Sequence, residues 1–320
     1  MDNELPLVSI ITPSLNQGSY IEETILSVKN QTYKEIEYIV IDGGSTDETL
    51  DILRKYSDSL TWISEPDKGQ SDAINKGWRM SKGKIIAYLN SDDTYMPWAV
   101  ETAVKFFTEH PYIAIVYGDC NIINEHGNVL GRLPGTAFNL ADLICGECMI
   151  PQPTAFLRRQ VIQDIGLLDV NLYMSMDFDL WIRTGLKFKV EYIPKVLANF
   201  RMCPGTKSVD ELLKFCDDDS YVLNKLFADP ELPKQIRDLK RRAYSGIQLK
   251  IGIRYHSLPQ MKEARKHFMK AFMLYPLNFL KSPWPAGYLI TSFLGAKATE
   301  IIVKYKRKLQ SSYHQDKCHE

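Results

Sequence analysis

The sequence IIAYLNSDD, residues 85–93, is an apolar run that ends abruptly in two adjacent carboxylates. Its first five residues predict a short buried strand. Asp92 and Asp93 would then stand at the carboxyl end of that strand, where open α/β sheets bind their ligands. Adjacent carboxylates repel each other unless a cation or a ligand hydroxyl lies between them, and oxygen ligands suit Mg²⁺ or Mn²⁺. The alternative is an ordinary polar turn, which Asp and Ser also favour.

Three earlier apolar runs, at residues 7–12, 36–41 and 60–64, also end in polar or glycine-containing loops. Apolar residues at helical spacing follow each of these runs. This alternation predicts an α/β fold with a mostly parallel central sheet flanked by helices. Because the carboxyl ends of parallel strands meet at one edge, the four loops would together form a crevice.

The composition is that of a soluble globular protein, with 320 residues, 45% hydrophobic and 24% charged. Its 39 basic and 39 acidic residues cancel, which argues against nucleic acid as the partner. No apolar run reaches the ~18 residues of a membrane span, and the acidic N-terminus lacks a signal pattern. We therefore expect a cytoplasmic protein with mostly reduced thiols. Cys145 and Cys148 form a CxxC motif, but no second pair follows at zinc spacing.

The second half of the chain predicts a change of architecture. Residues 121–132, with a turn at 125–128, predict a β-hairpin. A short strand is expected before it at 113–117, and the chain is expected to leave this strand in a turn at Gly118 and Asp119. Two further strands are expected at 190–193 and 196–200. Periodicity is helical from residue 209 onward, so we expect two domains, 1–208 and 209–320.

The helical region has two notable parts. Helices at 237–254 and 262–272 resemble one tetratricopeptide unit, which is too little for a solenoid. Residues 284–294 are apolar and aromatic, and a basic stretch follows, with Lys297, Lys304, Lys306, Arg307 and Lys308. Two interpretations stay open for this tail: an anchor lying on an anionic membrane, giving peripheral membrane association on its inner face, or a helix docked on the first domain.

Four motifs occur in order: TPSLN at 12–16, DGGSTD at 42–47, EPDKGQSDAINKG at 65–77 and NSDD at 90–93. This order resembles the family 2 glycosyltransferases, inverting enzymes with the GT-A nucleotide-sugar fold. The resemblance covers about residues 6–208. It implies transfer of a sugar from a UDP- or dTDP-sugar to a hydroxyl of a glycan or lipid-linked saccharide, assisted by Mn²⁺ or Mg²⁺.

The resemblance also implies which residues hold the donor. The residues expected to bind the nucleotide sugar are Pro13, Ser14, Asn16, Asp42, Gln70, Asp72, Asp92, Arg201 and Lys207. Asp42 would accept a hydrogen bond from the imide N–H of uracil or thymine, with a turn residue as the alternative. Asp92 would touch the ribose, and Asp93 would bind the metal ion that bridges the diphosphate.

The segment FRMCPGTKS, residues 200–208, resembles a loop that closes over the diphosphate. Arg201 and Lys207 would clamp phosphates, and a solvated surface charge is the alternative for each. Cys203 stands where the family often has a His that helps to hold the metal. Because thiolates suit Mg²⁺ and Mn²⁺ poorly, this departure puts a metal ligand from this loop in doubt.

On the acceptor side, MDFDLW at 176–181 resembles the segment that carries the catalytic base. Met176 replaces a Glu, and Asp177 keeps the Asp that would deprotonate the acceptor hydroxyl; one base with direct displacement implies inversion. The alternative for Asp177 is a carboxylate favoured by a helix N-terminus. Gln152 and Trp181 are expected to contact the acceptor, with burial in the core as the alternative for Trp181.

Two other classes of function compete with glycosyl transfer. A nucleotidyltransferase also combines an α/β sheet with a metal, but residues 12–18 contain no Lys or Arg for a basic phosphate loop. A non-catalytic nucleotide- or carbohydrate-binding module is the other, and the presence of Asp177 together with Asp92 and Asp93 argues against it.

Overall fold

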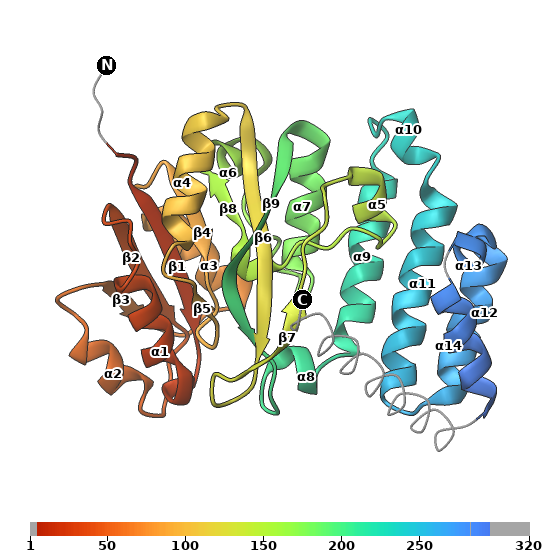
Figure 1. Cartoon of the computed structure of the whole chain (residues 1–320), viewed down its shortest axis with the longest axis horizontal. Coiled ribbons are helices and arrows are strands. Elements are labelled where there is room, and N and C mark those ends of the chain that lie inside the picture. Colours follow the sequence, from red (N-terminus) through yellow and green to blue (C-terminus); the bar gives the residue numbers. More distant parts are fainter. Residues whose placement is uncertain (1–4, 282, 295–320) are drawn as a thin grey trace, which may run out of the picture. The chain divides into compact units, whose positions relative to one another are not determined.

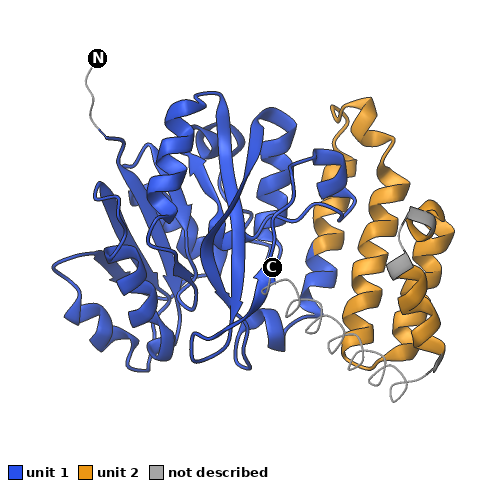
Figure 2. Ribbon diagram, in the orientation of Figure 1, with its two compact units in different colours: residues 1–218 blue, residues 219–320 orange. Residues whose placement is uncertain are grey.

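The computed structural model describes residues 5–281 and 283–294. Within these residues a nine-stranded sheet with helices along its faces forms the core of the N-terminal part (Figure 1). The chain divides into two units, residues 1–218 and residues 219–320 (Figure 2). Every predicted site residue belongs to the first unit.

One half of the sheet is parallel and has the strand order β3-β2-β1-β4. Its strands are β1 (Val8–Ser14), β2 (Ile36–Asp42), β3 (Thr61–Ser64) and β4 (Ile85–Tyr88). The helices α1 (Gly18–Lys29), α2 (Thr49–Lys55) and α3 (Gln70–Met80) connect them in turn. Every residue of β1 and β4 is buried, as the continuous apolar runs predict. The register pairs Ser14 with Asp42 and Asp42 with Ser64, so these strand ends meet at one edge.

The other half of the sheet is mixed. It contains β5 (Thr94–Tyr95), β6 (Ile113–Ile123), β7 (Val129–Leu133), β8 (Phe156–Arg158) and β9 (Lys189–Arg201). Strand β8 pairs antiparallel with β4 and β6, whereas β6 and β9 are parallel. The predicted hairpin is confirmed, because β6 and β7 pair antiparallel around residues 124–128. The remaining helical segments of this unit are α4 (Ala99–Glu109), α5 (Leu140–Ile144), the 3₁₀ turn η1 (Gln152–Thr154), α6 (Arg159–Ile165), α7 (Met176–Lys187) and α8 (Lys207–Asp210).

Two sequence-based strand boundaries are wrong. Strand β6 continues through Gly118 and Asp119 instead of turning out there, and the two strands expected at 190–193 and 196–200 are one strand, β9. The cause is non-local, because β6 and β9 pair along most of their length with register shifts near Asp119. A Cβ atom at residue 118 would collide with the carbonyl oxygen of Lys195, so Gly118 allows close approach here.

The second unit, as far as the structure describes it, is helical. Helix α9 (Lys214–Ala228) contains the boundary between the units, and α10 (Lys234–Arg237), α11 (Lys240–Ser257), α12 (Met261–Leu274), α13 (Leu277–Lys281) and α14 (Pro283–Leu294) follow. Helices α11 and α12 lie side by side (Figure 1), with Gly252 against the ring of Phe268. In α14, Thr291 hydrogen-bonds His256 at 2.9 Å, which docks this helix on α11.

The tail is therefore a helix that packs on its own unit through one side. The basic residues expected to follow it, Lys297 and residues 304–308, lie outside the described residues. No described helix combines the length and the apolar character that crossing a membrane requires.

Candidate active site

A cavity of about 600 Å³ is bounded by the loops that follow β1 and β4 and by parts of α3, α7 and α8. It therefore collects residues from across the first unit. The predicted site residues on its wall are Pro13, Ser14, Gln70, Asp92, Gln152, Asp177 and Lys207. The predicted residues that do not line it are Asn16, Asp42, Asp72, Asp93, Trp181 and Arg201.

The two adjacent carboxylates face different surroundings. Asp92 lines the cavity, whereas Asp93 is fully buried behind it. One carboxylate oxygen of Asp93 accepts a hydrogen bond from the backbone N–H of Arg201 at 2.9 Å, and the other accepts one from Asn90 at 3.3 Å. Burial raises the pKa of both carboxyl groups, and the charge of Asp92 raises the pKa of Asp93 further. A positive charge at this pair would relieve the repulsion.

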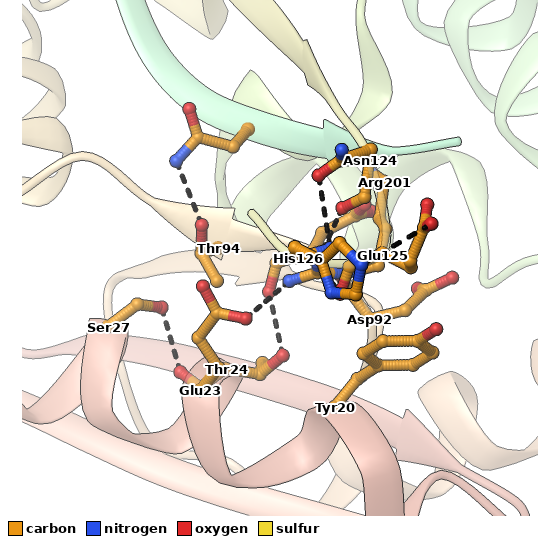
Figure 3. A network of polar contacts seen from close by, with 12 residues as sticks. Tyr20, Glu23, Thr24, Ser27, Asp92, Thr94, Asn124, Glu125, His126 and Arg201 are labelled. Atoms are coloured by element: carbon orange, nitrogen blue, oxygen red, sulfur yellow. Dashed lines mark hydrogen bonds and ion pairs between the residues drawn. The ribbon is translucent and has the colours of Figure 1, made fainter. Parts of the chain in front are cut away.

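Arg201 is fully buried and lies in a network of polar contacts with Asp92, Asn124 and Glu23 (Figure 3). Its Nε donates to the carbonyl oxygen of Asp92 at 2.9 Å, and Nη1 donates to the carbonyl of Asn124 at 2.8 Å. Nη2 forms an ion pair with Glu23, and the guanidinium stands 4.7 Å from the ring centre of Tyr20. Arg201 is thus neither a phosphate clamp on the cavity wall nor a solvated charge. It holds the turn that carries Asp92, a role that no local sequence pattern indicates.

Lys207 brings a positive charge to the cavity wall. Its Nζ donates to Gln70 Oε1 at 3.2 Å and to the carbonyl oxygen of Tyr173 at 3.0 Å, and it lies 3.7 Å from the centre of the Tyr173 ring. Burial lowers the pKa of this amine. The loop that carries Lys207 therefore supplies the cation that Arg201 does not.

A row of side-chain amides continues from Lys207 along the wall. Gln70 Nε2 donates to Asn90 Oδ1 at 2.7 Å, Asn90 Nδ2 donates to Gln152 Oε1 at 3.4 Å, and Gln152 Nε2 donates to the carbonyl of Tyr88 at 3.0 Å. Asn90 was not among the predicted site residues, although it stands two positions before Asp92. Its place at the end of a buried strand was the signal that could have identified it.

Asp177 occupies the first turn of α7 and faces the cavity. Its Oδ1 accepts a hydrogen bond from the backbone N–H of Phe178 at 2.8 Å, an arrangement that a helix N-terminus favours. Its negative charge contributes, after burial, to raising the pKa of Tyr88. Asp179 is buried and pairs with Arg183 at 2.7 Å, so it has the structural role expected from its position two residues further on.

Asp42 is fully buried and closes the loop that follows β2. Its Oδ2 accepts hydrogen bonds from the N–H of Gly44 at 3.1 Å, from the N–H of Ser45 at 2.9 Å and from Ser64 Oγ at 2.6 Å. This is the turn role that the sequence left open as the alternative. Asn16, at a φ of 52°, accepts from the N–H of Thr46 at 2.9 Å and thereby links the first two loops.

The other predicted residues away from the wall also have partners or positions of a structural kind. Asp72 accepts from the N–H of Lys68 at 3.1 Å. Trp181 is buried, which agrees with the core alternative.

Ser14 is different, because its buried Oγ lies on the wall and has no hydrogen-bond partner among the described residues. A buried hydroxyl without a partner suits a polar ligand group.

The wall also fits a divalent cation. Asp92 offers a carboxylate on the wall that Asn90 also lines, and Mg²⁺ typically uses one or two carboxylates together with substrate phosphates and water. Nowhere in residues 5–281 and 283–294 do three or more His, Cys, Asp or Glu side chains form a metal-binding group. Cys203 is buried away from the wall, with its sulfur 3.5 Å from the Tyr20 hydroxyl, so Asp92 is the residue through which a metal would be held.

Residues 9–166 match the family described as "Glycosyl transferase family 2". A protein of Mycobacterium tuberculosis, named an uncharacterized glycosyltransferase, is 30% identical over 199 residues, covering 61% of this chain and 75% of that protein. A similarly named protein of Rickettsia prowazekii is 32% identical over 209 residues, and this match covers 64% of its length.

Solved structures share the fold at low sequence identity. The mannosyltransferase PcManGT from Pyrobaculum calidifontis, solved with GDP-Man and Mn²⁺, has a TM-score of 0.61 at 18% identity, covering 91% of this chain and 87% of that one. S. aureus TarS 1–349, solved with UDP-GlcNAc, has a TM-score of 0.55 at 15% identity, covering 84% and 89%. These similarities confirm the GT-A architecture that the sequence predicts.

Proposed function

The chain belongs to glycosyl transferase family 2, and from this membership we propose that it transfers a sugar from a nucleoside diphosphate sugar to an acceptor hydroxyl with inversion. The observation that carries the proposal is the presence of Asp92 and Asp177 on the wall of one cavity of about 600 Å³. That volume is in the range of small-molecule sites. The acceptor class, a glycan or lipid-linked saccharide, is taken from the family resemblance.

In the proposed reaction, Asp177 is the general base. Its carboxylate takes the proton of the acceptor hydroxyl while the oxygen attacks the anomeric carbon of the donor. The bond between that carbon and the diphosphate oxygen breaks, and the nucleoside diphosphate leaves with the bonding electrons. Displacement from the opposite side inverts the configuration at the carbon.

Asp92 and Lys207 of the same wall would bind the diphosphate end of the donor. Asp92, and not the buried Asp93, is the proposed ligand of a divalent cation, because Asp92 is the carboxylate of the pair that reaches the cavity. A cation bound there would neutralise charge that develops on the leaving group. Lys207 would hold phosphate oxygens directly, and the unpaired hydroxyl of Ser14 would accept or donate a further hydrogen bond to the donor.

The donor is proposed to be a UDP-sugar, with a dTDP-sugar as the second choice. The structural neighbours named above were solved with UDP-GlcNAc in one case and with GDP-Man and Mn²⁺ in the other. Both ligands are nucleoside diphosphate sugars, which supports this class of donor, but their nucleobases differ. The carboxylate of Asp42 accepts its hydrogen bonds from its own loop, and Asp42 does not line the cavity. Ser14 and Pro13 are therefore the proposed contacts at the nucleoside end of the cavity.

A panel of UDP-, dTDP- and GDP-sugars with Mn²⁺ tests the proposal. We expect one donor class to raise the melting temperature of the full chain, EDTA to remove this shift, and nucleoside diphosphate to be released when an acceptor saccharide is added. Donor binding without release, over a panel of saccharide and lipid-linked acceptors, would favour a non-catalytic binding module. Formation of nucleoside triphosphate and sugar 1-phosphate from the donor and added pyrophosphate would favour a nucleotidyltransferase.

A further inference from the structure

Helix α12 exposes a face on which basic and apolar side chains alternate. Lys262, Lys266, Met269, Lys270 and Met273 recur at helical spacing, and all five are exposed. The opposite side of α12 is buried within the second unit. The exposed face is therefore a surface that the packing of the described residues of the second unit leaves open.

Large apolar side chains extend this face beyond α12. Phe272 of α12, Leu277 of α13, and Ile290 and Phe293 of α14 are exposed as well. The guanidinium of Arg265 lies 4.9 Å from the ring centre of Phe293, which joins the end of α14 to the basic end of α12. We call these residues the α12/α14 patch: Lys262, Arg265, Lys266, Met269, Lys270, Phe272, Met273, Leu277, Ile290 and Phe293. Helices α12, α13 and α14 contact one another, and large exposed apolar side chains gathered on neighbouring helices mark an interaction site.

We propose that the α12/α14 patch binds the surface of an anionic lipid bilayer. Its four basic residues face one acid on the same helix, Glu263, which pairs with Lys266 at 3.3 Å, so the patch has a positive charge. Interfaces between proteins are depleted in Lys, whereas a helix that lies on a membrane combines Lys or Arg with large apolar side chains. The mixture of lysines with Met and Phe therefore fits a lipid surface better than a second protein.

The geometry is that of a surface contact. Met273 and Phe293, 66% and 64% exposed, would enter the boundary between headgroups and acyl chains. The lysine stems would lie along them while the ammonium groups meet lipid phosphates. The 12 described residues of helix α14 are too few to cross a bilayer, and in the proposed contact they would lie in the plane of the surface.

Vesicle flotation of the full chain tests the proposal, with phosphatidylcholine vesicles that do or do not contain phosphatidylglycerol. The charge variant is Lys262→Gln/Lys266→Gln/Lys270→Gln, and the apolar variant is Met269→Gln/Met273→Gln. We expect the charge variant to bind anionic vesicles on the order of a hundredfold more weakly, the effect of three basic residues near a charged surface. The apolar variant should bind more weakly at both low and high salt. All five side chains are exposed, so both variants should keep the parent circular dichroism spectrum and melting temperature.

The matched control is Lys55→Gln/Lys105→Gln/Lys187→Gln, which removes the same charge from exposed lysines of the first unit. It should bind as the parent does. Equal weakening in the control, parent-like binding by the charge variant, or equal binding to neutral vesicles would overturn the proposal. So would a dimer in sedimentation velocity that the apolar variant dissociates, since the patch would then bind a second copy. The readout is vesicle binding, so it is independent of whether the chain transfers sugar.

Discussion

The backbone N–H of Arg201 donates to the carboxylate of Asp93 at 2.9 Å, while its side chain donates to the carbonyl of the preceding residue, Asp92. The end of β9 is thereby fixed to the turn after β4 from the side away from the cavity. Because Asp92 is the member of the pair on the cavity wall, Arg201 would act on a bound cation without contacting it, through the position of Asp92 and through its own charge, which lowers the pKa of the Asp92 carboxyl group against the effect of burial. Arg201 is a positioning residue by this geometry.

Replacing Asp177 by Asn should stop transfer while donor binding survives. Loss of a general base costs about 10²–10⁴-fold in rate, so kcat should fall by that range, with the Kd for the nucleotide sugar within twofold of the parent. Single-turnover assays and calorimetry measure the two quantities. Asp164→Asn, at a carboxylate of α6 that does not line the cavity, is the control and should retain full activity. Parent-like kcat in Asp177→Asn would remove Asp177 from the base role.

The two adjacent carboxylates should differ in metal binding. Asp92→Asn should abolish Mn²⁺-dependent donor binding, because it removes the carboxylate that reaches the cavity. Asp93→Asn should weaken Mn²⁺ affinity by only about 10–100-fold, as expected for a residue that supports a ligand. Titration of Mn²⁺ by calorimetry, with the nucleoside diphosphate present, measures both. A larger loss of Mn²⁺ affinity in Asp93→Asn than in Asp92→Asn would mean that Asp93, and not Asp92, is the metal ligand.

Replacing Arg201 by Met should destabilise the fold. The change leaves the carbonyls of Asp92 and Asn124 without their donor, which typically costs about 1–3 kcal/mol for each in the free energy of unfolding, and it removes the partner of the half-exposed Glu23. Glu23→Gln removes one partly exposed member of the network and should cost about 1 kcal/mol or less. Urea denaturation ranks the two variants, and similar values for both would contradict the buried role of Arg201.

Lys207→Met should weaken nucleotide-sugar binding. An ammonium group that donates to phosphate oxygens contributes roughly 1.5–3 kcal/mol, so we expect about a tenfold or greater rise in Kd. The control is Lys214→Met, because Lys214 lies 4.3 Å from the same Tyr173 ring but does not line the cavity. Equal effects of the two substitutions would mean that contact with Tyr173, and not the cavity, explains the loss.

Stability should fall as the pH drops below the ordinary histidine range. Burial lowers the pKa of both His256 and His267 below 6.5, so the unfolded chain binds protons more readily there. The free energy of unfolding should therefore be steady above about pH 6.5 and decrease below it. Urea denaturation from pH 8 to pH 5 measures this slope. The variant His256→Gln/His267→Gln should flatten it, and an unchanged slope would assign the effect to other groups.

The alternation of strands and helices was predictable because each element has its own periodicity. The rule that ligands lie at strand ends also led to Asp92, and the family resemblance of MDFDLW led to Asp177; both lie on the cavity wall. Arg201 was not predictable in the same way, because its partner Glu23 lies 178 residues away in the sequence. A buried arginine and an exposed phosphate-binding arginine have the same local sequence, and only tertiary packing separates them.

Asp42 and strand β6 show the same limit. The sequence DGGS fits both a ligand-binding loop and a self-closing turn, and the Asp42 carboxylate that closes the turn on Gly44 and Ser45 also takes a hydrogen bond from Ser64 Oγ, 22 residues further along. Strand β6 continues through Gly118 because β9 pairs with it there, and local turn preferences contain no information about that pairing. In each case a distant part of the chain supplies one of the contacts.

The row of contacts that begins at Lys207 has one polarity. Each member donates to the next: Lys207 to Gln70, Gln70 to Asn90, Asn90 to Gln152, and Gln152 to the Tyr88 carbonyl. The last acceptor is a backbone oxygen that cannot become a donor, so it dictates the orientation of every amide before it. Turning any one of them around would set two donors against each other. The oxygen that Gln70 presents to Lys207 is therefore required from both ends of the row, by an ammonium group that only donates and by the peptide oxygen of a buried strand that only accepts.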